Sequence, residues 1–230
     1  MSEYKDEPKN IIVEFLRANL TDPRGRDTST NTDTFSGTGS AQTLSLTPDL
    51  STNSAIAITD VSVGGSSINK WQDYDLDLQN QNVTGTFTSG TDNIVVTYKV
   101  GTATWIYSNL ARNTLSATNY PRINVLQVHD RAEQMGNYTT ELNHRMRYQV
   151  DIWVKDKYSY DDGTIIHVGD ELALYLGRKI AKLFSDNMNS LYPNLWDFSL
   201  IQISDAKWEI DKQCFHVIVE FYLNGIDIGS

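Results

Sequence analysis

The sequence predicts an α+β protein in which two helices pack on a four-stranded, mainly antiparallel sheet in the order α-β-β-α-β-β. A small all-β sandwich or barrel is predicted as an insertion in it. Two segments repeat apolar residues with helical spacing, and several others alternate apolar and polar residues as strands do. Between Asp27 and Thr118 the chain has no Glu and only three basic residues, unlike its flanks. The predicted domains are therefore residues 1–26 with 119–230, and an inserted β-rich domain, 27–118.

The first flank predicts one helix. Its apolar residues recur on a single helical stripe: Ile11, Ile12, Phe15, Leu16 and Leu20. Pro8 suits a first helical turn, and Asp22-Pro23 with Gly25 ends the helix. Residues 24–39 lack a periodic pattern, which predicts a linker.

The inserted stretch predicts short antiparallel strands separated by turn residues such as Gly64-Gly65. The predicted strands are 43–47, 55–63, 68–78, 83–88 and 94–100, with 103–107 as a possible sixth. Short strands at this spacing are typical of a small sandwich or barrel.

The second flank predicts two strands, a helix and a final hairpin. The strands are 123–128, 147–155, 200–210 and 214–223, and the helix begins with Asp170 as its N-cap. Helix and sheet should meet at a core that includes these residues: Ile152, Leu176, Ile180, Val217 and Val219.

Charge and cysteine usage exclude several classes of function. The net charge is −10 and the pI about 4.7, which argues against a surface that grips nucleic acid phosphates. The single cysteine, Cys214, excludes an intrachain disulfide. No apolar run matches a signal peptide or a membrane helix, so we expect folding in the cytosol and no membrane association.

No catalytic motif stands out, and we expect a protein that is not an enzyme and uses no metal or cofactor. Asp73, Asp75 and Asp77 share one face of a predicted strand, where they either bind a cation or form a solvated face. Four aromatic residues in the insertion either bind sugar rings or pack its core: Trp71, Tyr74, Trp105 and Tyr107.

A polar stretch in the second flank is the candidate interaction site. Residues 130–144 form a long predicted connection, which either reaches a neighbouring subunit or simply links two strands. The only local concentration of positive charge lies around it, with Arg122, Arg131, Arg145 and Arg147. The candidate residues are Asp130, Arg131, Glu133, Gln134, Met135, Gly136, Asn137, Tyr138, Arg145 and Arg147.

The order of segments resembles the tail terminator and tail-completion proteins of tailed bacterial and archaeal viruses. The resemblance covers roughly residues 4–26 and 120–225, and RYQVDIWVK followed by a Gly-Asp helix start is its most suggestive part. The segments that carry it are IIVEFLRANL, PRINVLQVHD, RYQVDIWVKDK, DELALYLGRKIAKLF, SLIQISDAKWEI and FHVIVEFYL.

The resemblance implies a structural virion protein, assembled in the host cytoplasm. It would form a homo-oligomeric ring, typically a hexamer, at the head-proximal end of the tail. Such a ring ends polymerisation of the tail tube protein and joins the tail to connector or neck proteins, while DNA passes through without sequence-specific binding. Another neck component, a head-completion or connector protein, is one alternative, and a glycan-binding decoration module is another.

Overall fold

The computed structural model describes residues 8–27, 29–48, 54–68, 73–77, 80–101, 104–108, 119–134, 142–191 and 195–227. The chain divides into two compact units, Met1–Thr104 and Trp105–Ser230. The predicted grouping of residues 1–26 with 119–230 depends on how these units lie relative to each other, and it stays a prediction.

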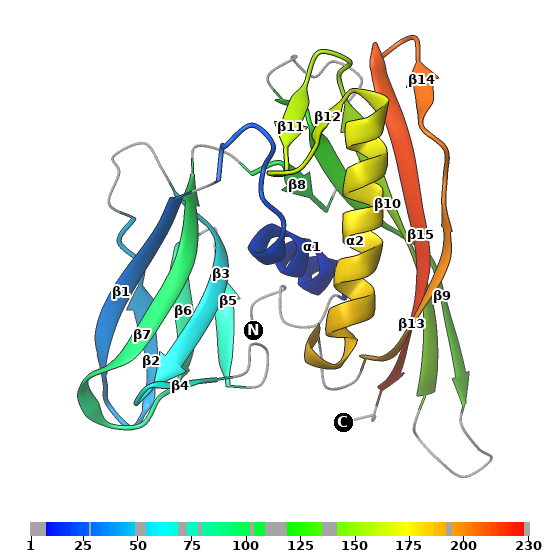
Figure 1. The fold of residues 1–230 in the computed structure, drawn as a ribbon. Coiled ribbons are helices and arrows are strands. Elements are labelled where there is room, and N and C mark those ends of the chain that lie inside the picture. Colours follow the sequence, from blue (N-terminus) through cyan, green and yellow to red (C-terminus); the bar gives the residue numbers. More distant parts are fainter. Residues whose placement is uncertain are drawn as a thin grey trace. The chain divides into compact units, whose positions relative to one another are not determined.

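The described residues of unit 1 form one helix and seven strands. Figure 1 shows how these elements are connected. The elements are α1 (Pro8–Asn19), β1 (Ser29–Gly37), β2 (Ala41–Ser45), β3 (Ser54–Val63), β4 (Ser66–Ser67), β5 (Tyr74–Asp77), β6 (Asn82–Thr86) and β7 (Gly90–Gly101). One sheet has the strand order β1-β7-β3-β4, and the other has the order β2-β6-β5. Apolar side chains of both sheets meet in one core, including Leu44, Ile58, Leu76, Val83 and Val96.

Helix α1 packs on β3, and a lysine from β7 holds its C-terminal end. The Lys99 ammonium donates hydrogen bonds to the carbonyl oxygens of Arg17 (3.0 Å) and Leu20 (2.7 Å). A cation is favourable there because the last carbonyls of a helix lack intrahelical donors and carry partial negative charge.

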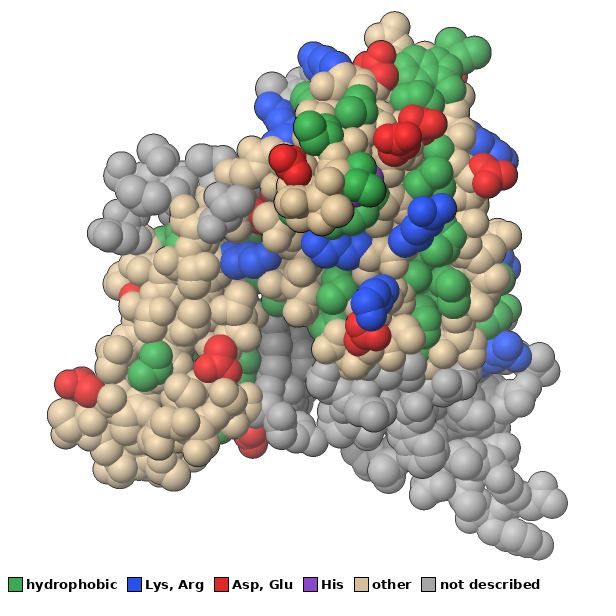
Figure 2. Space-filling view, viewed as in Figure 1, with side chains coloured by type: hydrophobic (Ala, Val, Ile, Leu, Met, Phe, Trp, Pro, Cys, Tyr) green, Lys and Arg blue, Asp and Glu red, His purple; other side chains and the backbone are tan. Residues whose placement is uncertain are grey.

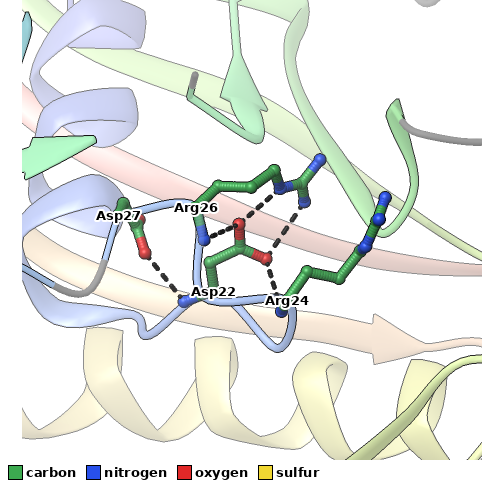
Figure 3. A network of polar contacts seen from close by, with 4 residues as sticks. All are labelled: Asp22, Arg24, Arg26 and Asp27. Atoms are coloured by element: carbon green, nitrogen blue, oxygen red, sulfur yellow. Dashed lines mark hydrogen bonds and ion pairs between the residues drawn. The ribbon is translucent and has the colours of Figure 1, made fainter. Parts of the chain in front are cut away.

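A compact turn, rather than a linker, follows α1 (Figure 3). The buried Asp22 carboxylate accepts hydrogen bonds from the backbone N–H groups of Arg24 and Arg26 and from the Arg26 guanidinium. The Asp27 carboxylate in turn accepts from the Asp22 N–H. The chain then enters β1 directly, so the predicted linker over 24–39 is wrong. Polar residues in β1, an edge strand, hid its extended conformation.

Unit 2 consists of a six-stranded sheet, a small hairpin and one long helix. Its elements are β8 (Ile106–Tyr107), β9 (Arg122–Gln134), β10 (Leu142–Val154), β11 (Ser159–Asp161), β12 (Ile166–Val168), α2 (Asp170–Leu191), β13 (Leu195–Ile203), β14 (Lys207–Glu209) and β15 (Cys214–Asp227). The sheet has the order β13-β15-β10-β9-β8, and β14 also pairs with β15. Its pairs are antiparallel except for β8 with β9.

Helix α2 packs on one face of this sheet, against β10, β13 and β15, and Figure 1 shows it in front of the long strands. Gly177 permits the close approach, because a Cβ there would lie 3.2 Å from a methyl group of Val217. The predicted core residues are buried, as expected: Ile152, Leu176, Ile180, Val217 and Val219.

The predicted fold class is wrong. The chain is mostly β-strand and forms several sheets, with two helices, instead of a two-helix layer on a four-stranded sheet. Helix α1 packs on β3, and the sheet beneath α2 has six strands. The error arose because polar strands and strand extensions carry no apolar alternation, and alternation was the signal used to count strands.

Candidate subunit-interaction surface

Most of the predicted interaction loop is strand. Asp130, Arg131, Glu133 and Gln134 lie in β9, and Arg145 and Arg147 lie in β10. The two strands pair as far as Leu142 with Gln134, and β15 continues the ladder on the other side of β10. The remaining candidates, Met135, Gly136, Asn137 and Tyr138, lie outside the described residues. The connection between β9 and β10 is therefore shorter than the predicted segment 130–144, because both strands extend into that segment.

The ladder brings Arg131 and Arg145 together but leaves Arg122 at the other end of β9. Arg131 and Arg145 are direct partners across β9 and β10. The guanidinium of Arg145 lies over the Tyr222 ring, 4.1 Å from its centre, and that of Arg122 over the Tyr107 ring at 3.6 Å. Burial lowers the pKa of the Arg122 guanidinium from its usual value, while Tyr107 and Tyr120 act in the opposite direction.

The sheet face opposite α2 is polar and partly buried. The Arg147 guanidinium donates to both carboxylate oxygens of Glu220, each at 2.9 Å, and the Gln202 amide donates to the same carboxylate at 2.8 Å. A second group joins Asp151 to the Gln149 amide and to a ring nitrogen of His216. These contacts connect β10, β13 and β15 on one face.

An aromatic stack continues this polar face toward β14. The rings of Trp153 and His216 lie parallel, 3.7 Å apart, and the Lys212 ammonium lies 3.7 Å from the centre of the Trp153 ring. Cys214 is fully buried beside Trp153, and its burial raises the pKa of the thiol. A buried thiol with a raised pKa fits a packing role better than that of a nucleophile.

Large hydrophobic side chains are exposed along the β13–β14 side of the sheet. Leu200 and Ile201 of β13 are 45% and 40% exposed, and Trp208 of β14 is 44% exposed. Ile210, just beyond β14, is 78% exposed. Figure 2 shows hydrophobic side chains among charged ones over this part of unit 2. Hydrophobic residues clustered at an open strand edge are typical of protein-interaction sites.

The opposite side of the sheet is also open for most of its length. Strand β8 pairs with β9 only at Ile123 and Asn124. Beyond Asn124, no strand in the described part of the chain pairs with the outer edge of β9. Val128 lies on this open stretch and is 48% exposed. The sheet therefore has two open edges, β13 and β9, each with exposed apolar side chains.

Sequence reasoning missed the exposed apolar residues of these edges. The segment SLIQI was assigned to a strand, but nothing in it showed that the strand would be at an edge. Edge position depends on long-range pairing, so local patterns cannot reveal it. Only Ile201 gave a local sign of irregular pairing. It is a large aliphatic residue directly after Leu200, so it breaks the apolar–polar alternation, and in the structure it lies at a bulge.

The three candidate aspartates lie in unit 1. Asp75 and Asp77 are half-exposed on β5, between the buried Tyr74 and Leu76, and Asp73 immediately precedes the strand. An open polar concavity of about 690 Å³ lies beside them. It is lined by Ala41–Thr43 of β2, Asp73–Asp75 and Thr84–Thr86 of β6. Among the described residues, no group of three or more His, Cys, Asp or Glu side chains is placed to hold a metal ion.

Comparisons with known proteins give no relative. No protein-family model matches the chain, and no curated protein matches it. Among the described helices, neither is both long enough and apolar enough to span a membrane.

Proposed function

We propose that the protein is a structural virion subunit, without enzymatic activity, that forms a ring at the head-proximal end of a viral tail. The ring would end polymerisation of the tail tube and join the tail to the head. The observation that carries this proposal is the pair of open, partly apolar edges on the sheet of unit 2. A protein that assembles head to tail needs two different surfaces of this kind on each copy.

The segments that resemble tail terminator proteins support the same conclusion. Five of the six form elements of unit 2, in chain order: β9, β10, α2, β13 with β14, and β15. The sixth is α1 in unit 1. The resemblance therefore falls mainly on the unit that has the open edges.

The proposed partners follow from this role. They are further copies of the chain, the tail tube protein below the ring, and the connector or neck proteins above it. DNA would pass through the opening. The net charge of −10 suits passage without capture, because tight DNA binding requires clustered cations to replace the counterions of the phosphates.

Negative-stain electron microscopy of the purified full-length chain tests the proposal. We expect uniform annular particles with a central opening. Incubated with tail tubes that lack a cap, these particles should sit at one end of each tube and stop its growth. Monodisperse single subunits that leave tube growth unchanged would contradict the proposal.

A glycan-binding role is the second candidate, and the concavity beside β5 favours it. Hydroxyl and carboxylate groups of Thr84, Thr86 and Asp75 belong to its lining, and such groups hydrogen-bond to sugar hydroxyls. A glycan array probed with the full-length chain and with Thr84→Val tests this role. Binding that the substitution abolishes would support it, and a blank array would count against it.

A further inference from the structure

We propose that neighbouring copies join edge to edge, with β13 of one copy pairing antiparallel with β9 of the next to form one continuous sheet. This inference rests on the proposed ring and names the surfaces that build it. In this arrangement, another copy of the chain covers each of the two open edges.

The directions of the strands permit this pairing. Successive strands of the series β13, β15, β10 and β9 are antiparallel, so β13 and β9 run in opposite directions within one copy. When a second copy is added alongside in the same orientation, its β9 runs antiparallel to the β13 of the first. Antiparallel pairing is the more favourable arrangement and leaves no unpaired backbone groups along the joint.

One register matches the side chains of the two edges. Placing Leu200 opposite Val128 brings together the exposed apolar residues of the two strands. The same register places Asp197 opposite Arg131, which pairs opposite charges. It also places Ile203 opposite Val125, the first residue of β9 beyond the stretch that β8 occupies.

This register also keeps the two faces of the sheet continuous. Within one copy, a single row of partners runs from Arg131 through Arg145 and Asn224 to Asp197. Another row runs from Val125 through Val150 and Val219 to Ile203, on the face that α2 covers. In the proposed joint each row continues into the next copy without a step along the strands. When the same contact is repeated from copy to copy, the series can close into a ring.

One bulge of β13 and the bulge of β9 fall at nearly the same place. Val128 is the extra residue where the β9–β10 register shifts, and Ile201 is the extra residue where the β13–β15 register shifts. In the proposed register they are one position apart. Because a bulge increases local twist, adjacent bulges let the two edges twist together.

Disulfide trapping of the full-length chain tests the pairing. In the variant with both Val128→Cys and Leu200→Cys, mild oxidation should give a ladder of covalent multimers that a reducing agent dissolves. An internal disulfide is excluded, because β10 and β15 separate the two edges by roughly 14 Å. Wild type, whose Cys214 is buried, gives the background.

Two matched variants make the result specific. The variant with Val128→Cys and Ile166→Cys keeps the cysteine on β9 and places the second cysteine at an exposed position outside the proposed joint. It should give no ladder of covalent multimers. Leu200→Cys alone should also give none. Covalent dimers from Leu200→Cys alone would show β13 pairing with β13 and would overturn the proposal.

Charge reversal supplies an independent readout. Asp197→Arg and Arg131→Asp should each weaken association, by up to about fivefold per contact, and the double variant should restore it. A double variant as weak as the single ones would contradict the register. If wild type forms multimers but neither test succeeds, the edge pairing fails and the ring remains. If wild type stays monomeric, both proposals fail.

Discussion

Glu220 and Arg147 join the two central strands of the large sheet through a forked ion pair. Both carboxylate oxygens of Glu220 lie 2.9 Å from one guanidinium nitrogen of Arg147, and the Gln202 amide donates to the same carboxylate. The Glu220 side chain is nearly buried. One carboxylate thus connects β10, β15 and the open edge strand β13.

Glu220→Gln should destabilise unit 2 by about 1–3 kcal/mol, because it leaves the Arg147 guanidinium without its counter-charge. Urea unfolding followed by tryptophan fluorescence measures the change. Lys182→Ala is the matched control, since it removes an ion pair with Asp186 on the exposed face of α2. That control should cost less than about 0.5 kcal/mol. Equal costs for the two variants would contradict the structural role of Glu220.

Lys99→Met should loosen the end of α1. The substitution keeps the length of the side chain but removes the donors to the carbonyl oxygens of Arg17 and Leu20. We expect a loss of about 1–3 kcal/mol in the unfolding free energy. We also expect faster amide hydrogen exchange in residues 16–20. The control Lys207→Met, on the exposed side of β14, should leave the unfolding free energy and the amide exchange unchanged. Unaltered exchange in Lys99→Met would refute the capping role.

Ile180→Ala should destabilise unit 2 by about 2–5 kcal/mol, because Ile180 is fully buried between α2 and the sheet. Ile210→Ala makes the same chemical change at a site that is 78% exposed, and it should be nearly neutral in the isolated subunit. Thermal unfolding at low protein concentration measures both. Similar costs for the two variants would show that the buried face of α2 is wrongly assigned.

The hairpin of β11 and β12 should respond to acid through Asp162. A hydrogen bond from His167, assisted by the N–H groups of Ile165 and Thr164, lowers the pKa of the Asp162 carboxyl to about 2. The unfolded value is about 3.9, so the stabilisation is present above about pH 4 and is lost as the pH falls through about 2. NMR titration of the carboxyl carbon should give a midpoint near 2, and a midpoint near 4 would contradict these contacts.

The sequence predicted the strongly periodic elements and missed the polar ones. The stripe of α1 and the alternation of Val217, Val219 and Phe221 located elements that the structure contains. Strand β1 and the outer halves of β9 and β10 are polar, and their extended conformation comes from pairing with other strands. Because local patterns do not encode such pairing, the number of strands and the fold class were wrong.

The candidate site was only partly accessible to sequence reasoning. The segment 130–144 was selected as unusual and interpreted as a loop, whereas strands β9 and β10 extend into it. The partner edge, with Leu200 and Ile201, was invisible because its exposure depends on where β13 lies in the sheet.

Sedimentation velocity of the wild-type chain beside Leu200→Lys tests the central claim most directly. We expect one large, closed species for wild type at micromolar concentrations. Leu200→Lys should sediment as a monomer with an unchanged unfolding temperature, because a charge at the joint blocks pairing without touching the core. Ile166→Lys, at an even more exposed site outside the joint, should remain assembled. A wild-type chain that sediments as a monomer across this range, or a Leu200→Lys variant that assembles like wild type, would contradict the account.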